Sequence, residues 1–283
     1  MSKDRSPEEQ AIWLSEQPSH RLAFEDIEYL ARDELRPARL ELELLKAEML
    51  QQEQGVSSTI VVFGSVRVPS PEAADAFLRQ AREHADADPK SELAQIELRR
   101  AHRRVELVRY YDEARRFARL VSEGTQNDGP LECVITTGGG PGIMEAANRG
   151  AHDVGAKSIG YNIEISHEQA PNPYIYPELC FNFHYFAIRK MHFLMRAKAL
   201  VIFPGGFGTM DELFDALTLI QTEKMPRMPV VLFSPEYWHR VMNLDVMVEE
   251  GTVSPQDLEL LTYVNTAEEA WQVIKDFYPD LQT

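Results

Sequence analysis

The sequence predicts an α/β fold with a doubly wound parallel sheet, helices on both faces of that sheet, and a helical extension at the N-terminus. Short runs rich in β-branched and aromatic residues recur along the 283-residue chain. Segments with the apolar spacing of helices separate these runs, and such alternation is typical of βαβ units. The runs lie at 58–66, 133–137, 158–163, 199–203, 229–234 and 261–264.

The N-terminal part of the chain lacks such runs. Residues 1–20 are polar, and between 23 and 54 leucines recur at near-helical spacing, with Pro37 breaking or restarting the pattern. We expect residues 1–55 to form a helical extension that covers the main domain or a second subunit. Residues 56–283 are then expected to form the main domain.

Within the main domain, the nearly continuous apolar run at 58–66 predicts a strand that is covered on both faces. Residues 71–125 are expected to form long helices, and the strongly charged stretch 82–104 to form an elongated or inserted helical arm. Right-handed crossovers would place helices on both faces of the sheet. Ligands in such sheets bind at the carboxyl ends of the strands. Further helices are expected at 142–154, 184–198, 209–222, 235–250 and 267–277.

Composition narrows the classes of function. The formal net charge of −16 disfavours binding to nucleic acid, so a phosphate site would have to be built locally from backbone N–H groups and a few cations. No apolar stretch approaches the ~20 residues that span a bilayer, and the N-terminus does not read as a secretory signal. Because Cys133 and Cys180 form no disulfide framework, we expect a cytoplasmic protein without a membrane partner.

Two predicted strand-to-helix turns are unusually rich in glycine. They are TTGGGPG at 136–142 and PGGFGT at 204–209. Glycine permits a sharp turn and close approach of a ligand, and the following helix N-terminus offers unpaired N–H groups. Neither turn fits the dinucleotide pattern G-x-G-x-x-G, because Ile143 and Asp211 occupy the third glycine position, and the P-loop lysine is missing. One such turn could be purely structural, but two in one sheet favour an anion site.

Charged residues lie next to the second turn. Arg189 belongs to an apolar, aromatic helix and so is expected to be buried, with Glu212 or a bound phosphate as its partner. Thr209 and Glu212 are three residues apart and therefore share one face of the first helical turn. Glu212 could bind ribose hydroxyls, activate water, or only stabilise the helix dipole.

These segments resemble one known family. FPGGFGTMDE is similar to the P-G-G-x-G-T-x-x-E signature of the Lonely Guy family, whose members are often mislabelled lysine decarboxylases. Arg189-Lys190 resembles the R-K element of that family, and TGGGPGIMEAANRGA resembles its first glycine motif. The likeness runs from about residue 58 to the end of the chain.

The resemblance implies a Rossmann-like catalytic domain at 56–283 that cleaves nucleoside 5′-monophosphates to free base and ribose 5-phosphate. The substrate would be AMP or a cytokinin-type N6-modified AMP, and neither a metal nor a cofactor is required. Arg189 and Glu212 would be the catalytic residues, and the chain would form a homodimer or a higher homo-oligomer. The implied substrate-binding residues are Gly139, Gly140, Glu168, Lys190, Gly205, Gly206, Gly208, Thr209 and Thr218.

Two other functions are compatible with parts of this sequence. The same fold could bind a nucleotide as a sensor without turning it over. A decarboxylase would need a Schiff-base lysine for pyridoxal phosphate, and Lys190 is the only well-placed candidate. Arg67, just after the first strand, could face the phosphate or be a surface cation.

Overall fold

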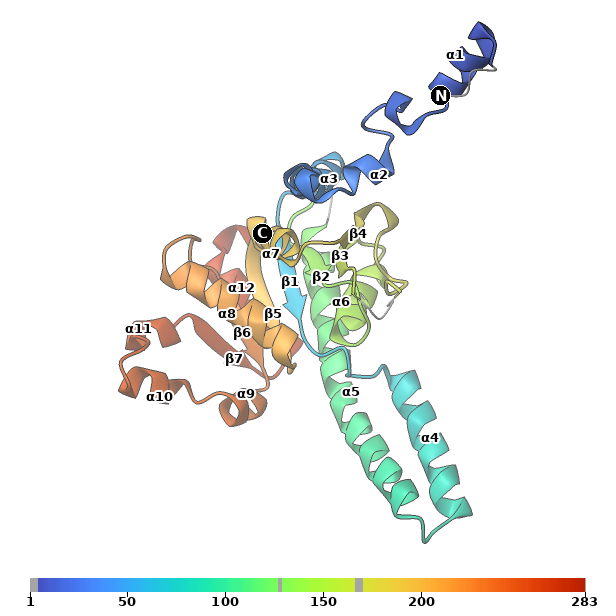
Figure 1. Ribbon diagram of the computed structural model, residues 1–283. Coiled ribbons are helices and arrows are strands. Elements are labelled where there is room, and N and C mark those ends of the chain that lie inside the picture. The colour runs from blue at the N-terminus through green and yellow to red at the C-terminus, as the bar shows by residue number, and fades with distance from the viewer. Residues whose placement is uncertain (1–4, 127–128, 166–169, 283) are drawn as a thin grey trace. The chain divides into compact units, whose positions relative to one another are not determined.

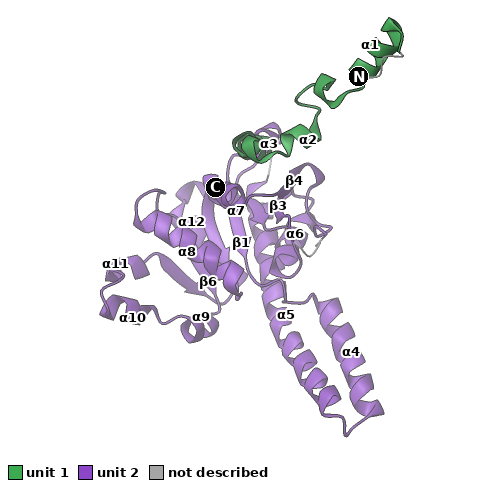
Figure 2. Cartoon of the chain, viewed as in Figure 1, with its two compact units in different colours: residues 1–46 green, residues 47–283 purple. Residues whose placement is uncertain are grey.

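The computed structural model describes residues 5–126, 129–165 and 170–282. Two compact units make up the chain, residues 1–46 and residues 47–283 (Figure 2). The first unit contains helices α1 (Pro7–Ser15) and α2 (Ile27–Leu30) and the first part of α3 (Arg36–Glu53). None of its described side chains is buried. Helices therefore precede the first strand, as the leucine spacing predicted.

The second unit is built on a seven-stranded sheet in which every neighbouring pair is parallel. The strand order is β4-β3-β2-β1-β5-β6-β7. The predicted strands are confirmed, and one more is present: β4 at one edge of the sheet. The strands are β1 (Thr59–Phe63), β2 (Val134–Thr137), β3 (Ser158–Ile163), β4 (Cys180–Phe183), β5 (Ala197–Ile202), β6 (Val230–Phe233) and β7 (Leu261–Val264).

Helices cover both faces of this sheet (Figure 1). The side chains of Ile60 and Val62 in β1 pack into one core with α5, α6 and α12. Phe63 lies on the opposite face, where its ring contacts Phe193 of α7 with centroids 4.9 Å apart. Covering on both faces explains why all of β1 is apolar or buried. The bounds are α5 (Glu92–Thr125), α6 (Ile143–His152), α7 (Phe186–Met195), α8 (Phe207–Gln221) and α12 (Ala267–Phe277).

The charged stretch 82–104 belongs to a helical hairpin made of α4 (Pro71–Ala87) and the first half of α5 (Figure 1). Small side chains, Ala81 and Ala85 on α4 and Ala94 and Ala101 on α5, are buried between the two helices. The second half of α5 packs on the sheet through larger residues such as Phe117. The hairpin is thus one continuous extension of a core helix, as expected for an inserted arm.

Three short helices lie between β6 and β7: α9 (Pro235–Val241), α10 (Leu244–Glu249) and α11 (Pro255–Leu258). The first two occupy the region that was expected to be helical at 235–250, where the helix is interrupted at Met242 and Asn243, and α11 lies beyond it. Throughout the described residues, every helix is too short or too polar to span a lipid bilayer.

Candidate functional site

The strand order creates a crevice beside β1. After β1 the chain builds β2, β3 and β4 to one side and then crosses over to place β5 on the other side of β1. In open α/β sheets, ligands bind outside the carboxyl ends of the strands at such a reversal. The loops there are joined directly, because Ser65 N donates to Pro204 O (3.1 Å) and Ile143 N donates to Ser65 O (3.2 Å).

A cavity of about 990 Å³ lies at this reversal. Its walls combine glycine-rich backbone, a few charged side chains and a larger set of apolar side chains. The lining residues are Phe63, Gly64, Ser65, Val66, Arg67, Val68, Leu107, Gly138, Met144, Phe186, Arg189, Pro204, Gly205, Gly206, Phe207, Gly208, Thr209, Met210, Asp211, Glu212, Phe214, Tyr237, Val241 and Met242.

The first glycine turn supports one wall of the cavity. Gly139 has a φ of +76° and Gly142 a φ of +75°, a region that L-residues rarely adopt. A side chain at Gly142 would also meet Ser65 O at 2.4 Å. Buried Asn172 holds the turn by donating to the carbonyl oxygens of Gly139 and Gly140, both at 3.1 Å. Of the glycines in this turn, only Gly138 lines the cavity; Gly139 and Gly140, which the resemblance implied as substrate-binding residues, do not.

The second glycine turn opens α8 directly onto the cavity. Gly206 is the N-cap of α8, and no side chain caps the first turn. The N–H groups at the start of a helix have no partner within it and carry a partial positive charge. Gly205, Gly206, Gly208 and Thr209 all line the cavity. The turn is held from α9, because the Tyr237 hydroxyl donates to Gly205 O (2.6 Å). This wall therefore offers unpaired backbone amides to an anion.

Arg189 reaches the cavity from α7. Its Nε donates to Tyr161 O at 2.7 Å and an Nη donates to Gly138 O at 3.4 Å, while its guanidinium lies 5.1 Å from the centre of the Phe193 ring. Burial lowers the pKa of Arg189, and the charge of Glu212 partly opposes that effect. Two carbonyl oxygens are thus partners of Arg189 that the sequence did not predict. Glu212 acts on Arg189 through its charge, and a bound phosphate as a further partner stays a prediction.

Glu212 lies in the first turns of α8 and is only 9% exposed. Burial raises the pKa of its carboxyl to about 7, although the charges of Arg189 and Lys190 act in the opposite direction. Among the described residues, no ion pair or hydrogen bond holds the Glu212 side chain, so its oxygens are available to a ligand in the cavity. A carboxyl whose pKa is near neutrality is suited to proton transfer.

Two residues implied by the resemblance point elsewhere. Lys190 Nζ donates to Asp211 at 2.8 Å and lies 3.8 Å from Asp215. The exposed hydroxyl of Thr218 donates to Phe214 O within α8 (2.7 Å). Neither residue lines the cavity. Glu168 lies outside the described residues. The structure thus brings together Arg189, Glu212 and the second glycine turn, but not Lys190 or Thr218.

A model of the family described as "Possible lysine decarboxylase" matches residues 144–274 of this chain. The C-terminal region of the chain is thus related to this family. The matched range contains Arg189, the second glycine turn and Glu212, and it begins just after the first glycine turn. The resemblance found in the motifs is therefore confirmed for the part of the chain that carries Arg189 and Glu212.

Curated relatives in this family match over a short region. "Probable cytokinin riboside 5'-monophosphate phosphoribohydrolase LOGL3" of Oryza sativa subsp. japonica is 29% identical over 93 residues, which are 32% of this chain and 44% of the relative. "Cytokinin riboside 5'-monophosphate phosphoribohydrolase LOG3" of Arabidopsis thaliana is 30% identical over 93 residues, 32% of this chain and 43% of the relative. The chain thus spans less than half the length of these relatives. The solved structure of the protein TM1055 is 19% identical, covers 77% of this chain and 99% of its own, and has a TM-score of 0.45.

Several cavity residues were not found by the motifs of the family. Leu107 comes from α5, and Tyr237, Val241 and Met242 come from α9 and its end. These side chains form a largely apolar wall facing the amides of α8. The local sequence does not predict that these residues line a cavity, because the other residues of their helices lie in the core or on the surface.

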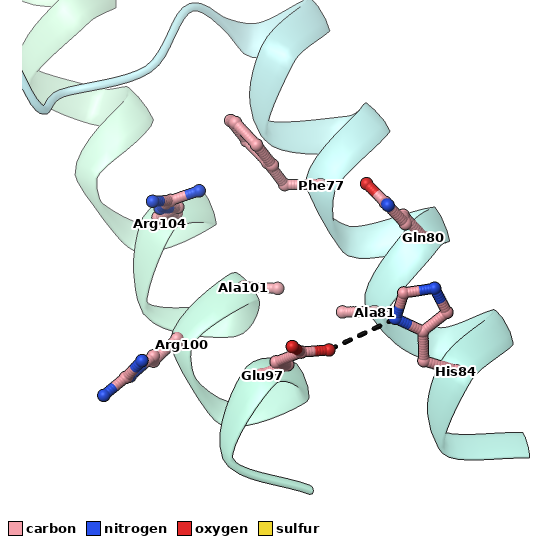
Figure 3. A pocket seen from close by; sticks show the side chains of 8 residues that line it. All are labelled: Phe77, Gln80, Ala81, His84, Glu97, Arg100, Ala101 and Arg104. Carbon is pink, nitrogen blue, oxygen red and sulfur yellow. Dashed lines mark hydrogen bonds and ion pairs between the residues drawn. The ribbon is translucent and has the colours of Figure 1, made fainter. Parts of the chain in front are cut away.

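A second, smaller hollow of about 250 Å³ lies on one face of the helical hairpin (Figure 3). Ala81 and Ala101 form its floor, and His84 pairs with Glu97 across one end at 3.2 Å. This hollow has no glycine turn and no helix N-terminus. Within the described residues, no three His, Cys, Asp or Glu side chains lie close enough to hold a metal ion. The crevice beside β1 is therefore the candidate active site.

Proposed function

We propose that this protein hydrolyses the N-glycosidic bond of a nucleoside 5′-monophosphate, releasing the free base and ribose 5-phosphate. One observation carries the proposal. A carboxyl with a pKa of about 7, Glu212, shares a cavity with the open N-terminus of α8 and with the guanidinium of Arg189. That set provides an anion site and a group for proton transfer side by side.

The chemistry follows from these groups. Cleavage of a ribosyl C–N bond passes through a state in which positive charge develops on the sugar, as in glycoside hydrolysis. Ionised Glu212 stabilises that charge and accepts a proton from the water that attacks C1′. The base leaves with the electron pair of the broken bond and takes up a proton. Glu212 is thus assigned the role of general base.

Arg189 and α8 position the substrate. The two bonds to carbonyl oxygens use two of the five N–H donors of the Arg189 guanidinium, which leaves three for a charged ligand. The amides at the start of α8 bind the 5′-phosphate, which lies away from the breaking bond. Binding energy from such a remote group lowers the barrier by fixing the sugar in place.

The substrate class is AMP or an N6-modified AMP. The curated relatives named as cytokinin riboside 5′-monophosphate phosphoribohydrolases support this choice, together with the family signature around Glu212. A pyridoxal-dependent decarboxylase fits poorly. Lys190 is paired with Asp211, and none of the described residues that line the cavity is a lysine.

We also propose that the chain assembles as a homodimer. Phe186, Met191 and Met195 of α7 are about half exposed, and Phe207 at the start of α8 is 96% exposed. Exposed apolar residues gathered on neighbouring helices mark protein interfaces. Sedimentation of the purified protein tests this proposal, which fails if the monomer persists at micromolar concentration.

The decisive experiment incubates the purified chain with a panel of nucleoside 5′-monophosphates and with the matching nucleosides, and follows free base and ribose 5-phosphate. We expect turnover of AMP or a related purine monophosphate and poor turnover of the nucleosides. Glu212→Gln and Arg189→Met should each lower kcat/KM by at least about 100-fold. Glu83→Gln, which removes an exposed carboxylate from the hairpin, is the control. Tight AMP binding without release of adenine would instead identify a nucleotide sensor.

A further inference from the structure

The loop between β1 and α4 holds Arg67 at the edge of the candidate active site. Ser65 N donates to Pro204 O in the neighbouring loop, and Arg67 N donates to Ser65 Oγ, both at 3.1 Å. Val68 follows immediately and is buried in the core. The backbone of Arg67 is therefore fixed on both sides, while its side chain is exposed and lines the cavity.

The charges around the cavity leave a role for this residue. The charged side chains among its described lining residues are Arg67, Arg189, Asp211 and Glu212. The carboxylates of Asp211 and Glu212 oppose the binding of a phosphate group, although Lys190 pairs with Asp211. Arg189 uses two of its N–H donors on carbonyl oxygens. The amides of α8 supply only about half a positive charge.

Arg67 is the second cation that lines the cavity. It forms no ion pair anywhere in the described part of the chain, in contrast to Lys190, which pairs with Asp211 and does not itself line the cavity. The hydrogen bond between Ser65 and Pro204 keeps its loop beside the glycine turn that opens α8. A planar guanidinium matches two phosphate oxygens at once, so arginine suits this position better than lysine.

We propose that Arg67 binds the 5′-phosphate together with the α8 amides and so selects phosphorylated substrates over nucleosides. In this inference the identity of the substrate rests on the proposed function, whereas the presence of a phosphate site does not. Arg67 comes from a loop outside residues 144–274, which the family model matches, so it would add a binding residue from another part of the chain.

The test measures binding of ribose 5-phosphate by calorimetry, because this compound carries the phosphate but no glycosidic bond to cleave. We expect Arg67→Ala to weaken binding about 10- to 100-fold, the loss typical of a hydrogen-bonded charge, and Arg67→Lys to restore part of it. Arg79→Ala, which removes an exposed arginine of α4 outside the cavity, should bind like the wild type. Circular dichroism and melting curves check that each variant is folded.

Steady-state kinetics provide the second readout. Arg67→Ala should raise KM for the nucleotide by a similar factor with little change in kcat, as expected for lost uniform binding. If the wild type binds ribose 5-phosphate and Arg67→Ala weakens that binding, the inference stands even when no nucleotide is hydrolysed. If nucleotides are hydrolysed but Arg67→Ala binds ribose 5-phosphate as tightly as the wild type, the inference falls alone. A wild type that does not bind ribose 5-phosphate overturns the inference, and one that also hydrolyses no nucleotide overturns the proposed function as well.

Discussion

Replacing Glu212 by glutamine should make the protein more stable while removing its proposed activity. Glutamine keeps the shape of the side chain but cannot ionise, so the change isolates the effect of a buried negative charge. Burial raises the pKa of Glu212 to about 7 from an ordinary value of 4.5. The folded protein therefore holds the proton more tightly than the unfolded chain, and ionisation of this group opposes folding.

The size of the effect follows from that difference. A tenfold change in an acid dissociation constant corresponds to about 1.4 kcal/mol, so the fully ionised carboxylate lowers the free energy of unfolding by about 3 kcal/mol. The loss begins as pH rises above 4.5 and is nearly complete above pH 7. Linkage gives about 2 kcal/mol at pH 6 and about 3 kcal/mol at pH 8. Glu212→Gln should recover these amounts.

Urea unfolding at pH 6 and pH 8 measures this recovery directly, since both values lie above the sequence pI of about 5.0. The midpoint of Glu212→Gln should exceed that of the wild type at both pH values, and by more at pH 8. The matched variant Glu83→Gln removes an exposed carboxylate and should change stability by no more than about 0.5 kcal/mol. If Glu212→Gln is less stable than the wild type at pH 8, the carboxylate is held by favourable contacts and the assigned pKa is wrong.

Two further predictions concern the same wall of the cavity. The acid limb of the kcat/KM profile should lie near pH 7, because ionised Glu212 is the active form. Lys190→Met should move this limb to higher pH, because it removes a positive charge that lowers the pKa of Glu212. The pH–rate profile measures both effects. Gly205→Ala should destabilise the protein, because the new Cβ would lie 2.1 Å from Thr209 Oγ1, whereas the Cβ of Gly206→Ala would meet no atom within 4 Å. Melting temperatures of the two variants check the difference. Equal decreases in melting temperature would contradict it.

Local patterns were sufficient to predict most of this fold. The run at 58–66 is continuous because β1 is buried on both faces, and continuous burial is the signal that sequence displays most clearly. The strand that was missed, β4, is an edge strand. Phe181 and Phe183 face inward while Cys180 and Asn182 are exposed, and a 3-10 turn starting at Pro177 precedes the strand directly. Four alternating residues after a proline do not stand out as a strand.

The site shows a similar division. Glycine turns and the residues next to them could be predicted, since backbone geometry and helix N-termini impose local requirements. The partners of Arg189 could not, because the carbonyl oxygens of Tyr161 and Gly138 belong to other strands and loops and carry no side-chain signature. Leu107 likewise joins the cavity only because the long helix α5 passes beside β1. Contacts of this kind depend on the assembled fold.

The geometry also explains how a chain with a net charge of −16 can attract a phosphate. Positively charged groups meet in one crevice, where α8 presents unpaired amides and Arg67 and Arg189 line the wall. Because Glu212 has a pKa of about 7, the neutral form of its carboxyl is accessible near physiological pH, so a dianionic ligand need not face a fixed negative charge there. The same raised pKa that lowers stability thus reduces repulsion during binding and leaves a base ready for the attack on the sugar.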